Sequence, residues 1–410
     1  MRVDHVQDRN RKIYDSVHGF IRFNEIENAL IDSYPFQRLH YLHQLGIAYL
    51  VYPGATHTRF EHSLGTMELA TRIFDKIASK FAIPDEDYWR QVIRLAALSH
   101  DLGHLPFSHV AEKQVLGKEG HERFTIEIIR SAELLPIWQK LNRASAIEDV
   151  IKMAVGFRKL GVLEPSLHFS PIEKILSEVI TADFFGADRI DYLLRDAFAT
   201  GVSHGLFDYD QLIETLCILP DNQGLNLGIE ENGIESCEAL LLARHFMHRR
   251  VYQYPSVKAY AFHLLRCMEN LNFSSLKEYL DLTDNEILVN VKKSRHSELH
   301  AAALFDRTLR FKAFALPKTV NEENFLQSIE QLKIPHEKIA WDFVKSGNKT
   351  LSLCFPVLVR GERVVDANSC SQVQIPLESA SWVYVSPELE KPLHNQLEKS
   401  YNWFNESSNK

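Results

Sequence analysis

Hydrophobic residues recur at helical spacing through most of the first 290 residues of this chain. Between residues 61 and 81, Leu69, Ile73 and Ile77 recur at a spacing of four, which predicts an amphipathic helix. Similar patterns predict helical structure over residues 88–102, 122–152, 171–200 and 236–270. The first 290 residues are therefore expected to form a mostly α-helical domain.

The pattern changes at one short hairpin and again near residue 290. Two strand-like runs at 216–220 and 225–230 are separated by Asp-Asn-Gln-Gly, which predicts a β-hairpin. Strand-like runs then appear at 309–316, 351–360 and 381–386, with helical segments at 322–332 and 387–404. We expect a multi-helix core with a small hairpin over residues 1–290. A smaller α+β region over residues 291–410 is expected to serve as an interface or in regulation.

Composition narrows the class of protein. With 45% hydrophobic residues, 24 Phe and 14 Tyr, the chain can bury a large core. It has no run of about 18 apolar residues and no apolar signal region at its N-terminus, so we expect no membrane segment and a cytoplasmic location. Five scattered cysteines indicate reduced thiols. The net charge of −8 argues against strong binding to duplex nucleic acid.

Three segments of the first half carry residues that bind divalent metal ions. They are RFEHSLG at residues 59–65, HDLGHLPFSH at residues 100–109 and ADRIDYLLRD at residues 187–196. We expect His62, His100, Asp101 and Asp188 to bind one ion. Imidazole suits Zn, Fe, Mn or Ni, and carboxylates shift the preference toward Mn, Mg or Fe, so the identity of the metal stays open. Such a ligand set leaves positions for water and substrate, which indicates catalysis.

The order of these segments resembles that of the HD-domain phosphohydrolases, which are named for their His and Asp metal ligands. More narrowly, the chain resembles their deoxynucleoside triphosphate triphosphohydrolase branch. The resemblance also includes DSVHG at residues 15–19, FQRLHYLHQLG at residues 36–46 and HRRVYQ at residues 248–253. It spans well over half of the chain and implies an HD-domain core in the first 290 residues.

The resemblance implies a proton donor beside the metal. His109 would protonate the leaving 5′-oxygen, with His104, His121 and Glu122 assisting. Histidine suits this task because its pKa lies near neutrality. Without the resemblance, an exposed loop pair is the preferred interpretation of His121 and Glu122.

The resemblance also assigns residues to the substrate. Gln44 and Leu45 would contact sugar and base, and Arg59, Arg189 and Arg244 would contact phosphates. Two stripes at a spacing of four residues would surround the nucleotide: Asp188, Tyr192 and Asp196, and then Arg244, His248 and Tyr252. On this mapping Asp196 reads the sugar 3′-hydroxyl and Tyr252 excludes a 2′-hydroxyl. Without the resemblance, each stripe could be a solvated helix face, and Arg59 could be a surface ion pair.

The expected reaction is hydrolysis of a deoxynucleoside triphosphate (dNTP) at the α-phosphorus, which yields deoxynucleoside and inorganic triphosphate. No Walker A loop is present, which argues against transfer driven from the γ-phosphate. Two alternatives stay open. The chain could hydrolyse another nucleotide phosphoester, or it could be a nucleotide-sensing or nucleic-acid-binding protein with a vestigial site.

The resemblance further implies a homotetramer and a nucleotide activator bound at a subunit interface. Asp32 matches a base-reading carboxylate of that second site. The position of its arginine partner is His40 here, and Tyr14 replaces a commoner asparagine. Because imidazole lacks the two parallel donors of a guanidinium group, activation by a guanine nucleotide is in doubt. Arg307 and Lys312 could belong to a phosphate-binding patch near a subunit interface, and surface charge is the preferred interpretation.

Overall fold

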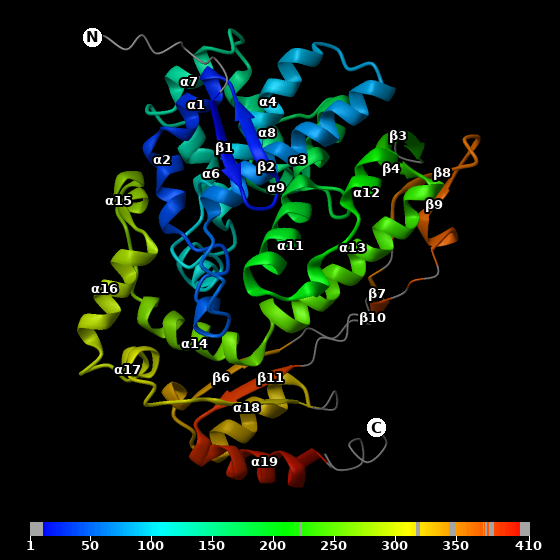
Figure 1. The fold of residues 1–410 in the computed structure, drawn as a ribbon. Helices are drawn as coiled ribbons and strands as arrows, with labels where there is room; N and C mark the ends of the chain where they lie inside the picture. Colours follow the sequence, from blue (N-terminus) through cyan, green and yellow to red (C-terminus); the bar gives the residue numbers. More distant parts are fainter. Residues whose placement is uncertain are drawn as a thin grey trace, which may run out of the picture. The chain divides into compact units, whose positions relative to one another are not determined.

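The computed structural model describes residues 11–221, 224–316, 320–343, 350–351, 353–371, 373, 375–376 and 381–401. The fold is mostly α-helical with small β-sheets, as the sequence predicted (Figure 1). Two compact units can be distinguished. The first contains Met1–Arg250, Asn272–Asp284 and Ser352–Ile375, and the second contains Val251–Leu271, Asn285–Leu351 and Pro376–Lys410. Packing therefore does not divide the chain once at residue 290, and a functional boundary there stays a prediction.

The first unit begins with a β-hairpin that the sequence did not predict. Its strands are β1 (Arg11–Asp15) and β2 (Gly19–Phe23). The helices that follow are α1 (Glu25–Ile31), α2 (Tyr34–Gln37), α3 (Arg59–Lys80), α4 (Glu86–Ser99), α5 (Glu112–Val115), α6 (His121–Ile129), α7 (Leu135–Gln139), α8 (Ala146–Val155), α9 (Phe157–Leu163), α10 (Pro171–Thr181), α11 (Ala187–Thr200) and α12 (Tyr209–Thr215). Short 3-10 turns lie at Arg38–Tyr41, Ala48–Leu50 and Ser203–Gly205.

Helix α3 is the centre of this unit because it packs against both α4 and α11. Leu69, Ile73 and Ile77, which predicted the helix, are fully buried on it. Its first turns are also buried, including Arg59 and His62. Polar side chains at such positions need partners because an unpaired buried polar group is costly. The N-terminal end of α3 is therefore where the core becomes polar.

Two predicted helices are broken in the structure. The single helix expected over residues 171–200 is two helices, α10 and α11, separated at residues 182–186. The break occurs where Gly186 lies against backbone carbonyls, and an added Cβ would lie 2.5 Å from the Ile180 carbonyl oxygen. Residues 122–152, also predicted helical, contain the three helices α6, α7 and α8. Hydrophobic spacing within these two segments did not reveal any of the three breaks.

The predicted hairpin at 216–230 is present, with β3 (Leu216–Asp221) antiparallel to β4 (Gly224–Glu230). Two strands from the C-terminal part extend it into a sheet of order β3-β4-β8-β9. They are β8 (Pro356–Val359), which runs parallel to β4, and β9 (Arg363–Asp366). The strand predicted over 351–360 is therefore wrong as one element, since β7 (Thr350–Leu351) pairs instead with β10 (Ile375–Pro376).

A π-helix interrupts the helical segment predicted over residues 236–270. Helix α13 (Ile234–Met247) passes into the π-helix His248–Tyr252, and α14 (Pro255–Met268) follows. The wider π turn breaks the exact spacing of four expected for Arg244, His248 and Tyr252. Tyr252 is half-buried and belongs to the second compact unit.

The second unit has the expected α+β character. Its three-stranded sheet has the order β5-β11-β6, with β5 (Lys312–Ala315), β6 (Ile339–Asp342) and β11 (Trp382–Val385). The remaining helices are α15 (Leu276–Asp281), which packs with the first unit, and α16 (Asp284–Ser294), α17 (Leu299–Phe305), α18 (Glu322–Gln331) and α19 (Pro387–Tyr401). Phe325, Val383, Leu393 and Leu397 form part of its core. Residues 402–404 of the predicted last helix lie outside the described residues.

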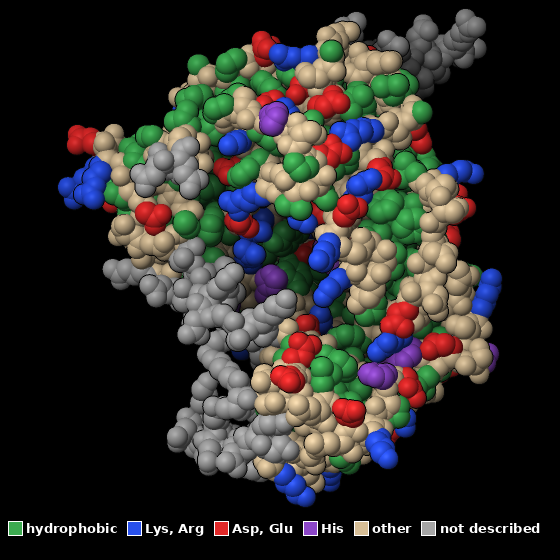
Figure 2. All heavy atoms as spheres, turned by 180° about the vertical axis from the view of Figure 1, so that it is seen from behind, with side chains coloured by type: hydrophobic (Ala, Val, Ile, Leu, Met, Phe, Trp, Pro, Cys, Tyr) green, Lys and Arg blue, Asp and Glu red, His purple; other side chains and the backbone are tan. Residues whose placement is uncertain are grey.

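The surface mixes charges of both signs. On the face shown in Figure 2, Lys and Arg side chains alternate with Asp and Glu side chains among the described residues. This agrees with the modest net charge of −8. Among the helices of the described residues, none is long and apolar enough to cross a membrane.

Candidate metal centre

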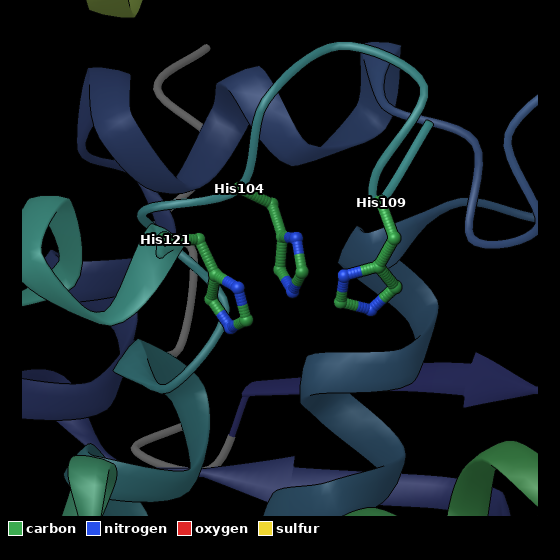
Figure 3. A group of neighbouring side chains, drawn as sticks. All are labelled: His104, His109 and His121. Carbon is green, nitrogen blue, oxygen red and sulfur yellow. The ribbon is translucent and has the colours of Figure 1, made fainter. Parts of the chain in front are cut away.

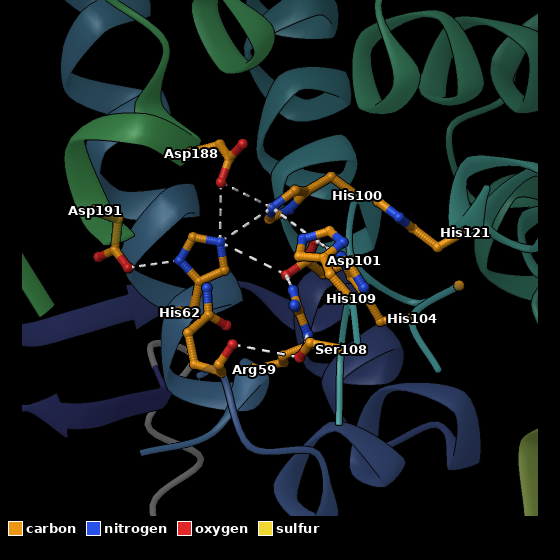
Figure 4. Close-up of polar contacts among 12 residues, drawn as sticks. Arg59, His62, His100, Asp101, His104, Ser108, His109, His121, Asp188 and Asp191 are labelled. Carbon is orange, nitrogen blue, oxygen red and sulfur yellow. Dashed lines mark hydrogen bonds and ion pairs between the residues drawn. The ribbon is translucent and has the colours of Figure 1, made fainter. Parts of the chain in front are cut away.

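The four predicted ligands come together from three helices (Figure 4). His62 lies on the second turn of α3, His100 and Asp101 follow the end of α4, and Asp188 lies in the first turn of α11. Nε2 of His62 lies 3.1 Å from Asp188 Oδ1, 3.3 Å from His100 Nε2 and 3.6 Å from Asp101 Oδ2. Nε2 of His100 lies 3.6 Å from Asp188 Oδ1. Donor atoms of His62, His100 and Asp188 therefore surround one point, and Asp101 lies beside His62.

The second nitrogen of each imidazole is already occupied. Nδ1 of His62 lies 2.8 Å from Asp191 Oδ2, and Nδ1 of His100 lies 2.7 Å from the Ala97 carbonyl oxygen. Each of these nitrogens donates its proton, which leaves each Nε2 as the nitrogen that can bind a metal ion at the same point. Two nitrogens bound to one metal at about 2.0–2.1 Å would lie roughly 3 Å apart, close to the observed separation. The residues fit a divalent metal ion.

The charge at this point favours a cation. Burial lowers the pKa of His62, but hydrogen bonds with Asp188 and Asp191 outweigh burial and raise the pKa to about 10. Burial raises the pKa of Asp188, and hydrogen bonds with His100 and His62 more than reverse that effect. The carboxylates therefore stabilise positive charge between them, which a bound metal would supply.

A buried network holds His62 in place. Asp191 accepts hydrogen bonds from His62 and from His18, whose Nε2 lies at 2.6 Å, and it also pairs with Arg195 at 2.9 Å. Arg195 pairs in turn with Asp15 at 2.7 Å. Asp15 and His18 of the DSVHG segment thus hold Asp191 and Arg195, and Asp191 orients the ligand His62. The network requires Gly65 on α3, where an added Cβ would lie 2.0 Å from Asp191 Oδ1.

Arg59 is buried beside Asp101. It is 3% exposed, and its guanidinium group pairs with Asp101 Oδ2 while Nε donates to Ser108 Oγ at 3.0 Å. Burial raises the pKa of Asp101, but Arg59, His100 and His104 together hold this pKa well below its usual range. Arg59 is therefore no surface ion pair, and it borders the predicted metal position.

Three histidines, His104, His109 and His121, form a cluster (Figure 3), and this cluster lies next to the four ligands (Figure 4). The rings of His104 and His121 stack with centroids 3.6 Å apart, and His109 lies 4.9 Å from His104. Stacked rings direct their in-plane lone pairs side by side, which does not suit one shared metal ion. His104 Nε2 lies 3.2 Å from Asp101 Oδ1, so the group is linked to the ligand set. The arrangement suits proton transfer.

Glu112 joins two of these histidines, and sequence reasoning missed it. Its Oε1 accepts from His121 Nδ1 at 2.6 Å, and its Oε2 is paired with His109 Nδ1. Burial raises the pKa of Glu112, but the hydrogen bonds with His109 and His121 lower it much further. Glu122, by contrast, pairs with Lys159 at 2.6 Å and lies 3.9 Å from His121. The spacing of three residues between His109 and Glu112 was the sequence signal that could have indicated this pairing.

The loop that carries His109 is strained. Phe107 and Ser108 both adopt a positive φ of 58°, a conformation that costs a non-glycine residue of order 1–3 kcal/mol. Ser108 Oγ donates to the His43 carbonyl oxygen at 2.9 Å. The His109 side chain itself is 68% exposed. A proton donor that must reach a substrate needs such access.

Asp196 lies beside another histidine that sequence reasoning missed. His57 Nε2 donates to Asp196 Oδ1 at 2.7 Å, and both residues are buried. The carbonyl oxygen of His57 accepts from the Gln44 N–H at 3.0 Å. Gln44 Oε1 is buried without a hydrogen-bond partner among the described residues. The structure thus links Gln44, with Leu45 next to it, to Asp196 through His57.

The second stripe of predicted substrate residues meets the first. Arg189 pairs with Asp183 at 3.1 Å and hydrogen-bonds with Tyr192. Burial, followed by the charges of Arg244 and Arg189, lowers the pKa of His248 to about 4. Arg189, Tyr192, Arg244 and His248 therefore form one group in the first unit, in which Arg189 and Arg244 carry the positive charge.

Comparison with protein families gives two matches. Residues 59–192 match the HD domain, and residues 207–342 match the HD associated region. The chain belongs to the HD-domain family. The HD-domain match includes all four candidate ligands and the three clustered histidines.

Known HD-domain relatives include both uncharacterized proteins and enzymes. An uncharacterized protein of Methanocaldococcus jannaschii is 34% identical over 251 residues, which cover 60% of this chain and 46% of that protein. The deoxynucleoside triphosphate triphosphohydrolase SAMHD1 of Bos taurus is 29% identical over 275 residues, which cover 61% of this chain and 45% of the enzyme. The chain spans about half the length of the curated relatives it matches.

A solved structure of a hypothetical protein from Aquifex aeolicus is also similar. It has a TM-score of 0.76 and 32% sequence identity, over 95% of this chain and 100% of that one. The resemblance therefore extends beyond the two matched segments to most of the fold.

Proposed function

We propose that this HD-domain protein is a metal-dependent phosphohydrolase that cleaves dNTPs at the α-phosphorus, releasing deoxynucleoside and inorganic triphosphate. The family relationship supports a hydrolase, and the similarity to SAMHD1 supports the narrower reaction. The observation that carries the proposal is the convergence of His62, His100 and Asp188 beside the cluster of His104, His109 and His121. One group can hold a metal ion and the other can hold a proton.

Different residues of the chain would carry out metal binding, proton donation and charge stabilisation. A divalent metal held by His62, His100, Asp101 and Asp188 would supply Lewis-acid polarisation of a phosphate. His109, exposed and paired with Glu112, holds a proton for the leaving 5′-oxygen. The guanidinium group of Arg59 keeps Asp101 ionised beside the reacting phosphate.

Different residues would also bind the phosphates, the sugar and the base of the substrate. Arg189 and Arg244 place positive charge for the triphosphate, and His248 stays neutral near pH 7 because its pKa is about 4. Asp196 and Gln44, linked through His57, supply polar atoms for the sugar and base. Tyr252 is assigned to the 2′ position of the sugar.

The product distinguishes this reaction from other phosphoester cleavages. Metal-replete protein would be incubated with each dNTP singly and with all four together, and the products resolved by ion-exchange chromatography. We expect deoxynucleoside and triphosphate in equal amounts. Orthophosphate or pyrophosphate would contradict cleavage at the α-phosphorus, and turnover of another nucleotide phosphoester alone would move the assignment within the HD-domain family.

The mixture also tests activation by a nucleotide. We propose a homotetramer with a nucleotide activator near Asp32, where a surface hollow of about 440 Å³ is lined by Arg11, Asn28, Asp32 and Phe60. His40 stacks on Phe60 with ring centroids 3.5 Å apart. Turnover that appears only in the mixture would show activation of one nucleotide's hydrolysis by another. Equal rates with single and mixed dNTPs would contradict it.

A further inference from the structure

The loop between the metal ligands and His109 is held by a segment far away in the sequence. We call residues 276–284, which contain α15 and the first residue of α16, the strap. The strap belongs to the first compact unit, and the chain continues from both of its sides into the second. It also lies in the segment that matches the HD associated region, outside the HD-domain match.

The strap bonds to the backbone of the loop at two places. Asp284 is fully buried, and its Oδ1 accepts from the Phe107 N–H at 2.7 Å. The hydroxyl of Tyr279, also fully buried, donates to the Gly103 carbonyl oxygen. These bonds hold the two sides of the short stretch between Gly103 and Phe107.

Two further residues complete the connection. Oδ2 of Asp284 accepts from His43 twice, from N–H at 2.9 Å and from Nδ1 at 2.6 Å. Arg38 donates to the Leu282 carbonyl oxygen at 2.9 Å and to the His104 carbonyl oxygen at 2.9 Å. The guanidinium group of Arg38 also lies over the Tyr279 ring. Both oxygens of Asp284 are therefore used, and all bonds lead to the loop or to its support.

We propose that Asp284 is a positioning residue for the reaction: it fixes the Phe107 amide in the left-handed turn that presents His109. Phe107 and Ser108 are both left-handed at φ 58°, and such a turn persists only where its surroundings determine it. Asp284 touches neither the candidate metal ligands nor His109 in any contact of the described residues. Its effect on chemistry must therefore pass through the loop. This role rests on the proposed function of His109 as proton donor.

The test compares Asp284→Asn with Asp281→Asn. Asp281 lies in the same strap but is exposed, and its carboxylate accepts from the Tyr34 hydroxyl at 2.8 Å. An amide at position 284 offers one acceptor oxygen where the carboxylate offers two. We expect kcat to fall roughly 10- to 100-fold in Asp284→Asn, the scale on which misplacement of a catalytic group acts. The KM and the metal content of Asp284→Asn should stay unchanged. The control variant Asp281→Asn should keep the kcat of the wild type.

A double-mutant cycle separates positioning from general damage. In a His109→Ala background, Asp284→Asn should cost less than about twofold, because the group it positions is gone. Independent, multiplicative losses would overturn the proposal. If Asp284→Asn does not fold, Tyr279→Phe removes one strap bond while keeping the ring, and it should show a smaller loss with the same non-additivity.

Amide hydrogen exchange gives a readout that does not depend on the substrate. Exchange across residues 103–110 should accelerate in Asp284→Asn and not in Asp281→Asn. Unchanged exchange in this loop would overturn the positioning role. If exchange is faster in Asp284→Asn but the wild-type protein hydrolyses no phosphoester, the role of the strap is supported and the proposed function is contradicted.

Discussion

At the scale of single residues, the candidate metal centre shows that ligand side chains depend on partners behind them. His62 is oriented by Asp191, which is shared with His18 and Arg195. Asp101 is shared between the ligand group and Arg59. Asp188 differs because its side chain is 39% exposed and, among the described residues, it pairs with His62 and His100. Removal of Asp188 should therefore affect the metal and little else.

This difference predicts distinct outcomes for two variants. Asp188→Ala should lose bound metal and activity while keeping the stability of the metal-free wild type. Asp101→Ala should also lose metal and should in addition be destabilised by about 3–5 kcal/mol, because it leaves Arg59 buried without its carboxylate. Metal per chain can be measured by mass spectrometry after dialysis, and stability by denaturant unfolding. Full metal occupancy in either variant would contradict the ligand assignment.

Removal of the metal gives the matching control. Because a metal that binds only the folded protein stabilises it, a chelator should lower the Tm of the wild type. The Tm of Asp188→Ala should not respond to the chelator. An equal response in both proteins would place the metal elsewhere.

At the scale of elements, close approach between α3 and α11 places His62 beside Asp188. The approach occurs at Gly65, where an added Cβ would lie 2.0 Å from Asp191 Oδ1 and 2.4 Å from a guanidinium nitrogen of Arg195. Both of those atoms belong to fully buried side chains in a paired network, so they have little room to move. The glycine of RFEHSLG is therefore a packing requirement between two helices.

Gly65→Ala is expected to destabilise the protein by about 1–3 kcal/mol through overpacking, despite the better helix propensity of alanine. It should also reduce metal affinity, since Asp191 can no longer orient His62. Gly161→Ala on α9 is the matched control, because an added Cβ there meets nothing within 4 Å. That variant should be neutral or more stable by up to about 1 kcal/mol. Similar denaturant midpoints for the two variants would contradict this account.

At the scale of the whole molecule, the two compact units carry different polar interiors. The first contains the candidate centre, and the second contains a buried pair in which His263 Nδ1 lies 2.9 Å from His300 Nδ1. His263 stacks on Phe311, and the nearby Cys267 is paired with Glu298 at 3.4 Å. Burial, followed by the neighbouring His300, lowers the pKa of His263 to about 3. Two units with separate cores need not unfold in one step.

Acid should therefore weaken the second unit. The pKa of His263 is about 3 in the folded chain and about 6.5 in the unfolded chain. Between these pH values the unfolded chain therefore binds a proton on His263 that the folded chain does not bind. Stability is retained above about pH 6.5 and is lost as pH falls toward 3, by up to about 2 kcal/mol at pH 5. Hydrogen exchange in α14 and α17 at about pH 7 and pH 5 measures this loss. His263→Gln should reduce the pH dependence, and an unchanged dependence would contradict the assignment.

Local sequence patterns were sufficient for some features of this protein. The helix α3 and the hairpin of β3 and β4 followed from spacing within about 20 residues. The four candidate ligands followed from three short segments and their resemblance to a family. The structure brings the donor atoms of His62, His100 and Asp188 together and places Asp101 3.6 Å from His62. Side-chain periodicity and motif residues are local properties, so they can be read without knowing the fold.

The hydrogen-bond partners of the site residues became known only from the tertiary structure. Asp191 meets His18 across 173 residues of sequence, and Asp284 meets Phe107 across 177. The pairing of β8 with β4 also joins segments that are distant in the chain. Such contacts form because buried polar groups must find partners wherever folding brings them, and no spacing along the chain records which partner that will be. The sequence by itself determined which side chains can bind a metal, whereas the folded structure decided what holds them in place.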